Sequence, residues 1–374
     1  MYTNVEHVAD GAIRRSSLFP NAAGYEMIQA RDREGWSMPP ERSMPVREHR
    51  ESLRDHMKSV GIGDLTGSRS RFALSGPDWG GPISFIDGDS APNEADGRNP
   101  PPWPVVGIGA HHEGGAEKLD TFVEDGFDPF QIRKAVEACP IAAATLVQLL
   151  RLLPSLGLKD GLVAESLAYA ALQGGNEHRT WLARRAPPDA KRGPGAVRLV
   201  REGDTVIATL DRAGAGNAID RSMRDALSEA FALVNLDPTI TSITLRGEGR
   251  CFSVGADIGE FGTTLDPATA HAIRRRTLPA NQAVLCADRF VAEIDGACVG
   301  AGLELAAFAG RVTATRRSWF QLPELAMGII PGAGGCVSLT RRIGRHRTAL
   351  LVLSGRRLSA KKALEWGLVD ALVD

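Results

Sequence analysis

The chain lacks an excess of charge of either sign. Its 374 residues contain 44 Lys and Arg and 45 Asp and Glu, which gives a formal net charge of −1. Like charges do not gather into blocks, whereas binding to a nucleic-acid backbone relies on clustered Lys and Arg. We therefore expect no nucleic-acid partner.

Patterns typical of metal sites and disulfide frameworks are also missing. The five cysteines include no C-x-x-C pair, which argues against a structural zinc site or a set of disulfides. His111, His112 and Glu113 are consecutive, so their side chains point apart, and no further ligands follow at zinc spacing. We expect no metal site and interpret this run as a polar surface loop.

Long apolar runs are absent as well. No stretch approaches the roughly 18 uncharged apolar residues of a membrane-spanning helix, and the N-terminus has no apolar core before a cleavage site. We expect no membrane span and no Sec signal. The scattered cysteines favour a reducing cytoplasm.

The length predicts more than one domain, because single domains usually have roughly 100–200 residues. Residues 1–127 are rich in Pro, Gly, Asp, Arg and Ser, and we expect them to be mostly irregular, with a short helix near Arg47–Ser59. Residues 128–190 have apolar side chains at three- and four-residue spacing and form a predicted helical domain. Its predicted helices cover Pro129–Glu137, Ile141–Leu153 and Leu162–Leu182.

A Pro-rich polar run at 183–194 breaks the helical pattern and predicts a linker. Residues 195–374 follow it with alternating strands and helices, which is typical of an α/β domain. Two of the strands are expected to form a hairpin across Glu202, Gly203 and Asp204. The predicted strands are Ala196–Val200, Thr205–Leu210, Ile240–Arg246, Phe290–Ile294 and Arg311–Ala314, and the first long helix is Met223–Asn235.

Two glutamates are the strongest chemical signal. Glu304 and Glu324 each lie beside a glycine-rich, apolar stretch that is suited to exposing backbone amides. A positioned pair of carboxyl groups can act as a general acid and a general base. Either glutamate could instead begin a solvated helix, where negative charge near the N-terminus is favourable.

Five segments, in order along the chain, resemble the landmarks of the crotonase superfamily (enoyl-CoA hydratase/isomerase). The resemblance covers roughly the C-terminal half and implies a ββα spiral core, here preceded by a mostly helical N-terminal domain. It also implies a coenzyme A thioester as substrate, no further cofactor, a role in fatty acid metabolism, and a homo-oligomer such as a trimer or hexamer. The five segments are Asn217–Asp220, Cys251–Ile258, Asp295–Glu304, Pro323–Gly335 and Leu358–Asp370.

The resemblance assigns functions to individual residues. The backbone amides of Ala256 and Ala301 match an oxyanion hole that stabilises negative charge on a thioester oxygen; Ala301 replaces the usual glycine. Glu304 matches the group that orients or deprotonates water, and Glu324 matches the group that exchanges a proton with carbon. Keeping both carboxyls favours a hydratase over an isomerase. Substrate or coenzyme A contacts are expected at Gly255, Asp257, Ile258, Gly300 and Gly332.

Some of these residues have a second interpretation. Asp257 could instead cap and hold the oxyanion loop, and Gly332–Gly335 is expected to be a tight turn that opens a helix at Val337. Arg274–Arg276 could contact the phosphates of coenzyme A, but a solvated helix face is the favoured interpretation. Cys298 and Cys336 are interpreted as packed core residues.

Two departures from the family pattern leave other functions open. The sequence ends at Asp374, shortly after the last landmark, so we expect this domain to lack the C-terminal helices usual in the family. Residues 165–181 resemble the N-terminal extension of the cofactor-free dihydroxyphenylacetyl-CoA dioxygenase branch, and we expect these helices to cover the site instead. The alternatives are therefore an arylacetyl-CoA dioxygenase-like enzyme and a non-catalytic acyl-CoA-binding homologue.

Overall fold

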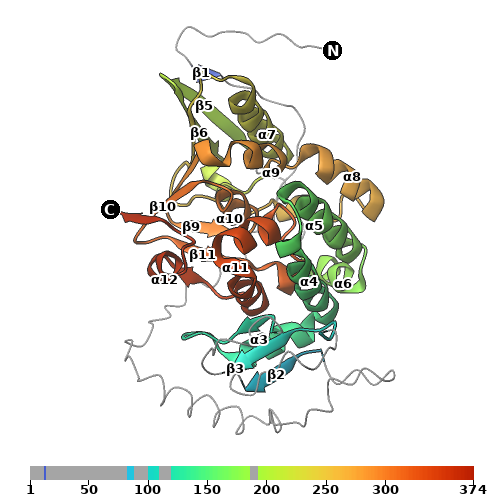
Figure 1. Cartoon of the computed structure of the whole chain (residues 1–374). Coiled ribbons are helices and arrows are strands. Elements are labelled where there is room, and N and C mark those ends of the chain that lie inside the picture. Colours follow the sequence, from blue (N-terminus) through green and yellow to red (C-terminus); the bar gives the residue numbers. More distant parts are fainter. Residues whose placement is uncertain (1–11, 14–81, 88–99, 109–118, 186–192) are drawn as a thin grey trace.

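The computed structural model describes residues 12–13, 82–87, 100–108, 119–185 and 193–374 (Figure 1). Three sequence predictions lie wholly or partly outside these ranges. They are the short helix at Arg47–Ser59, the polar run His111–Glu113, and most of the linker at 183–194.

A seven-stranded sheet forms the centre of the C-terminal half, with the strand order β1-β5-β6-β7-β8-β10-β13. The pairs β1–β5 and β5–β6 are antiparallel, and the pairs from β6 to β13 are parallel. The predicted hairpin is confirmed, and Gly203 makes its turn with φ of 63°. The strands are β1 (Ala12–Ile13), β5 (Ala196–Glu202), β6 (Thr205–Asp211), β7 (Ser242–Gly247), β8 (Phe290–Ile294), β10 (Arg311–Thr315) and β13 (Ala371–Val373).

Helices between these strands follow the apolar pattern of the sequence. The predicted helix at Met223–Asn235 is α7 (Arg221–Leu236), and the Asp220 side chain caps it by accepting from Met223 N. Its buried face packs on the sheet, which is why the apolar residues recur at helical spacing. The next helices are α8 (Pro267–Thr277) and α9 (Ala280–Ala283).

A second sheet of three strands, β12-β11-β9, takes two of its strands from the segments 295–304 and 358–370, which resemble family landmarks. It consists of β9 (Ala297–Val299), β11 (Trp319–Gln321) and β12 (Leu358–Ser359). Around it lie α10 (Ala301–Ala306), the 3-10 turn η10 (Glu324–Met327), α11 (Gly335–Ser354) and α12 (Ala360–Glu365). The predicted tight turn is present, since Gly334 has φ of 106° directly before α11.

Four helices form the segment before the linker. They are α3 (Pro129–Ala138), α4 (Pro140–Leu152), α5 (Leu158–Gln173) and α6 (Asn176–Arg184). The first two predicted helices are confirmed. The prediction of one helix over Leu162–Leu182 is wrong, because the chain turns at Gly174 and Gly175, and two adjacent glycines favour such a break.

Residues 1–127, which we expected to be mostly irregular, contain a small parallel sheet. Its strands are β2 (Ser84–Asp87), β3 (Val105–Ile108) and β4 (Thr121–Phe122). Strands this short give almost no periodic signal in a sequence. The sheet joins the rest of the molecule through Thr121, whose hydroxyl donates to His346 O of α11 at 2.7 Å.

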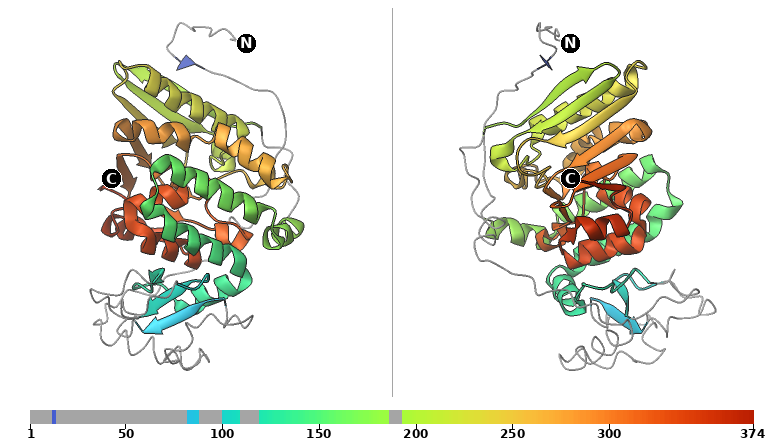
Figure 2. Two further views of the ribbon diagram at one scale, coloured as in Figure 1. Left: turned by 45° about the vertical axis from the view of Figure 1, so that its right-hand side comes forward. Right: turned by 90° about the vertical axis from the view of Figure 1, so that its left-hand side faces the viewer.

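The helical segment and the α/β half share one hydrophobic core. Leu146 and Leu150 of α4 are buried in the same cluster as Phe231 of α7 and Phe290 of β8. Helix α5 lies against both α11 and α8, and Figures 1 and 2 show this arrangement from different sides.

In the described residues no single helix has the length and apolarity of a membrane span. Helices α3 and α4, the latter extended to Ser155, have that length and apolarity only when taken together, and they are bent by 108° where they meet.

Candidate active site

Glu304 lies on the short helix α10 and is 2% exposed. Its Oε2 accepts from Ala333 N at 2.6 Å and from Gly335 N at 2.8 Å, both at the start of α11. The alternative in which Glu304 begins a solvated helix is therefore wrong. Burial raises its pKa to about 7, although the amides of Ala333 and Gly335 oppose that rise.

Glu324 opens the turn η10 and is also buried, with 8% exposure. Its Oε1 lies against Gly300, where an added Cβ would come within 2.8 Å of it. Its Oε2 has no hydrogen-bond partner among the described residues. Burial, and then the nearby Glu304, raise the pKa of Glu324 well above its usual range.

The loop with Gly255 lies against the start of α10. Gly255 has φ of 102°, and a Cβ there would be 3.1 Å from Val299 O and 3.6 Å from Ala301 N. This close approach brings the segments of Ala256 and Ala301 together, as the resemblance implied. Ala301 N is the first amide of α10, where helical amides have no partner within the helix.

The second amide of the expected oxyanion hole is also free to donate. Its neighbours are engaged, since Gly255 N donates to Ser253 Oγ at 3.1 Å and Asp257 N donates to Ile219 O at 2.9 Å. Between them, Ala256 N has no hydrogen-bond acceptor among the described residues. The two amides therefore belong to segments that approach each other where Gly255 lies against the start of α10.

Asp257 holds this loop. Its carboxylate is 2.7 Å from Arg212 Nη1 in a buried ion pair and accepts from Gly259 N at 2.9 Å. Arg212 also donates to Ala218 O at 3.1 Å. This geometry supports the capping interpretation of Asp257 rather than a substrate contact. The following residue, Ile258, begins the 3-10 turn η8 (Ile258–Glu260), and its carbonyl oxygen accepts from Arg185.

Helix α5 adds residues that the sequence did not single out. The ring of Tyr169 covers Gly332, where an added Cβ would lie 2.2 Å from it. Arg274 of α8 stacks on that ring, 4.1 Å from its centroid. Burial raises the pKa of Tyr169 to about 12, and the Arg274 guanidinium opposes this rise, whereas Glu304 and Glu324 add to it.

This arrangement corrects the interpretation of Arg274 as part of a solvated face. Arg274 donates to Gln173 Oε1 at 3.0 Å as well as stacking on Tyr169.

The positions of Glu165 and Tyr169 in α5 could have been found from the sequence. Leu162, Glu165, Ser166 and Tyr169 recur at three- and four-residue spacing and therefore share one face of the helix. A charged residue on the apolar face of a helix is a sign of a buried polar contact.

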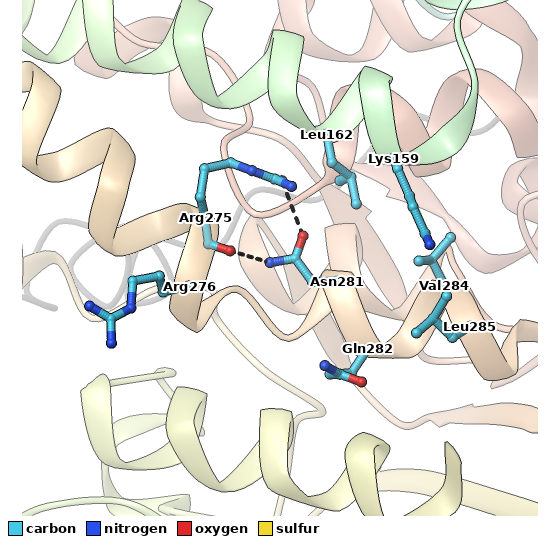
Figure 3. Close-up of a pocket in the computed structure, with 8 residues that line it drawn as sticks. All are labelled: Lys159, Leu162, Arg275, Arg276, Asn281, Gln282, Val284 and Leu285. Carbon is cyan, nitrogen blue, oxygen red and sulfur yellow. Dashed lines mark hydrogen bonds between the residues drawn. The ribbon is translucent and has the colours of Figure 1, made fainter. Parts of the chain in front are cut away.

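A cavity of about 300 Å³ lies beside this region, between α5 and the α8–α9 segment (Figure 3). Arg275 in its wall donates to Asn281 Oδ1 at 3.1 Å. The walls contain neither Glu304 nor Glu324. The lining residues are Lys159, Leu162, Arg275, Arg276, Asn281, Gln282, Val284 and Leu285.

The cysteines and candidate ligands can be compared with the sequence predictions over the described ranges. All five cysteines are free thiols, and Cys298 and Cys336 are buried in the core, which confirms their interpretation as packed residues. Burial raises the pKa of both thiols well above the usual range. In these same ranges no cluster of three or more His, Cys, Asp or Glu is arranged to hold a metal ion.

Known proteins are similar to the C-terminal half of this chain. A sequence model described as Enoyl-CoA hydratase/isomerase matches residues 201–374. A probable enoyl-CoA hydratase of Bacillus subtilis is 33% identical over 176 residues, which are 47% of this chain and 68% of that protein. The 2,3-dehydroadipyl-CoA hydratase of Escherichia coli is 32% identical over 170 residues, 46% of this chain and 66% of that protein.

Parts of solved structures also match this chain. The crystal structure of an enoyl-CoA hydratase from Thermoplasma volcanium is 36% identical, covers 48% of this chain and 71% of its own, and has a TM-score of 0.44. The chain spans somewhat less than two thirds of several curated relatives, for example 64% of a probable enoyl-CoA hydratase of Mycobacterium tuberculosis. Because this chain matches 68% of the Bacillus subtilis protein at 33% identity, it belongs to the enoyl-CoA hydratase/isomerase family.

Proposed function

We propose that this chain hydrates 2-enoyl-CoA thioesters with Glu304 and Glu324 as its acid–base pair. The observation that carries the proposal is the difference between the two buried carboxyls. Glu304 accepts hydrogen bonds from two backbone amides, whereas Glu324 Oε2 has no hydrogen-bond partner among the described residues. Amide donors favour an ionised carboxylate and burial without donors favours a protonated one, so the pair can hold one base and one acid near neutral pH.

In the first step, the oxygen of a water molecule bonds to the β-carbon while Glu304 takes a proton from that water. The π electrons of the double bond move through the thioester onto its carbonyl oxygen. Negative charge develops there, and the amides of Ala256 and Ala301 are the proposed donors to it. Preorganised backbone donors of this kind stabilise a developing oxyanion by several kcal/mol.

In the second step, the electrons of the enolate form a bond from the α-carbon to the proton of Glu324. The product is a 3-hydroxyacyl thioester, with Glu304 protonated and Glu324 ionised. Exchange of protons with solvent restores both groups. The overall reaction adds one water and requires no oxidant or further cofactor.

The relatives support the reaction class. The Bacillus subtilis relative is a probable enoyl-CoA hydratase, and the Escherichia coli relative is a 2,3-dehydroadipyl-CoA hydratase. We extend a coenzyme A thioester substrate to this chain on that basis and on the two carboxyls. A homo-oligomer and a cytoplasmic location stay predictions from the sequence.

The test is hydration of a panel of 2-enoyl-CoA thioesters by the purified full chain, followed by the loss of enoyl-thioester absorbance. Glu304→Gln and Glu324→Gln should each lower kcat by roughly 10²- to 10⁴-fold, because each removes one proton-transfer group. Thermal unfolding of both variants serves as the control for folding.

Three results would contradict the proposal in different ways. Hydration that survives both substitutions would remove the acid–base assignment. Oxygen uptake with an arylacetyl-CoA, in place of hydration, would favour the dioxygenase alternative. Tight binding of enoyl-CoA without turnover would favour a non-catalytic binding protein.

A further inference from the structure

Helix α5 contributes a third buried carboxylate to the site. Glu165 is 1% exposed and lies outside residues 201–374, the part of the chain that matches the family. Its Oε1 accepts from Gly334 N at 2.7 Å. Its Oε2 accepts from Cys336 N at 2.9 Å and from Val337 N at 3.3 Å. A segment outside the family match therefore holds the first turn of α11.

The same turn also holds Glu304. Along the chain, the amides of Ala333 and Gly335 donate to Glu304, while those of Gly334, Cys336 and Val337 donate to Glu165. Five consecutive amides are thus divided between two carboxylates. A helix N-terminus has an effective charge of only about +0.5, so it cannot by itself neutralise two carboxylates.

Several charged or titratable groups face Glu165 from the elements packed around it. Glu304 of α10 and Glu324 of η10 interact with it electrostatically, as do Arg274 of α8 and the thiol of Cys336. Burial and then the charge of Glu304 raise the pKa of Glu165 to about 8. The repulsion is mutual, because like charges in one site oppose each other's ionisation.

We propose that Glu165 is a positioning residue for Glu304: it fixes the turn whose two other amides hold Glu304, and it couples the charge states of the two carboxyls. The inference rests on the proposed hydration and deepens it. Helix α5, which lies outside the matched residues 201–374, would thereby hold the general base in place.

The first test is the pH dependence of kcat for the full chain and for Glu165→Gln. In the wild type, ionisation of one carboxyl raises the pH needed to ionise the other. Glu304 ionises first, with a pKa of about 7, and Glu165 follows with a pKa of about 8. Gln cannot ionise, so the change in kcat that the wild type should show as Glu165 ionises is expected to be absent from Glu165→Gln. We also expect kcat at the pH optimum to fall about ten-fold or more. The Gln side chain cannot accept hydrogen bonds from all three N–H groups, so the first turn of α11, which holds Glu304, should shift.

Glu177→Gln is the matched control. Glu177 of α6 also holds a helix start, accepting from Ile141 N at 2.8 Å and Ala142 N at 2.9 Å. Its loss removes the same type of hydrogen bond from α4, and among the described residues Glu177 makes no hydrogen bond to the turn that holds Glu304. Loss of the change on the alkaline side of the profile in Glu165→Gln but not in Glu177→Gln supports the proposal, and equal profiles in all three proteins overturn it.

The second test needs no substrate. Carboxyl ¹³C shifts of labelled glutamate are titrated in the wild type, Glu165→Gln and Glu304→Gln. Glu304→Gln should lower the pKa of Glu165, because the charge of Glu304 is one cause of its rise, and an unchanged Glu165 titration would overturn the coupling. If the wild type hydrates no enoyl-CoA but its carboxyls titrate as a coupled pair, the proposed function fails while the coupling stands.

Discussion

At the scale of single residues, the site depends on space that glycines leave open. A Cβ at Gly335 would lie 2.4 Å from Glu304 Cγ, and one at Gly300 would lie 2.8 Å from Glu324 Oε1. Real Cβ atoms do not come this close to other atoms, so each glycine lets a glutamate approach the backbone. The glycines of these landmark segments are therefore explained by the space that the glutamate side chains occupy, and not only by the conformational freedom of turns.

Gly335→Ala should displace the Glu304 carboxylate from the amides of α11. We expect a loss of about 1–3 kcal/mol in the free energy of unfolding, as for overpacked core positions, and about 10- to 100-fold lower kcat from the displaced base. Urea unfolding and enoyl-CoA hydration measure the two effects. Gly214→Ala is the control, because a Cβ there meets nothing within 4 Å; equal effects of both substitutions would contradict the steric explanation.

At the scale of elements, the oxyanion loop is held by a buried ion pair. Arg212, directly after β6, reaches across to Asp257, and both side chains are almost fully buried. Asp220, the cap of α7, lies 3.6 Å from the same guanidinium. One arginine thus joins the hairpin, the first long helix and the loop that positions Ala256.

Arg212→Met should leave Asp257 with a buried, unpaired charge. Removing one partner of a buried pair costs about 3–5 kcal/mol, so we expect a strong decrease in the urea midpoint. Arg133→Met removes an exposed pair with Glu137 on α3, where about 0.3–0.5 kcal/mol is expected. Comparable midpoints for the two variants would refute a structural function for the buried pair.

At the scale of the whole molecule, the helices before the linker belong to the same core as the α/β half. Buried residues of α3, α4 and α5 pack in one cluster with those of α11 and the large sheet. Tyr169 and Glu165 reach the site from this segment. The expectation that these helices cover the site agrees with that packing.

Deletion of residues 1–192 should therefore expose the apolar surface of α11 that α4 and α5 cover. We expect the remaining chain to lose its cooperative thermal transition and to bind a dye specific for exposed apolar surface, as loosely packed states do. Calorimetry and dye fluorescence measure both. A remainder that unfolds cooperatively with full hydration activity would show that the helices are dispensable.

Much of the fold was predictable because its signals are local. The hairpin β5–β6, helix α7 and strands β8 and β10 follow from apolar periodicity and turn residues close in sequence. The break between α5 and α6 was missed, although Gly174 and Gly175 mark it. The short strands β2 to β4 were missed because two to four residues carry too little pattern.

By itself, the sequence determined the α/β class, the family and the two glutamates that stand out among glycines. Only the tertiary structure decided how the carboxyl of Glu304 is held. Glu304 and Glu165 are separated by 139 positions in the sequence (304 − 165), and both accept hydrogen bonds at the N-terminus of α11. Burial, amide donors and neighbouring charges determine the pKa of a carboxyl group. None of the three can be predicted from the spacing of residues close in the sequence. The acid–base character of the site is therefore a property of the packed molecule.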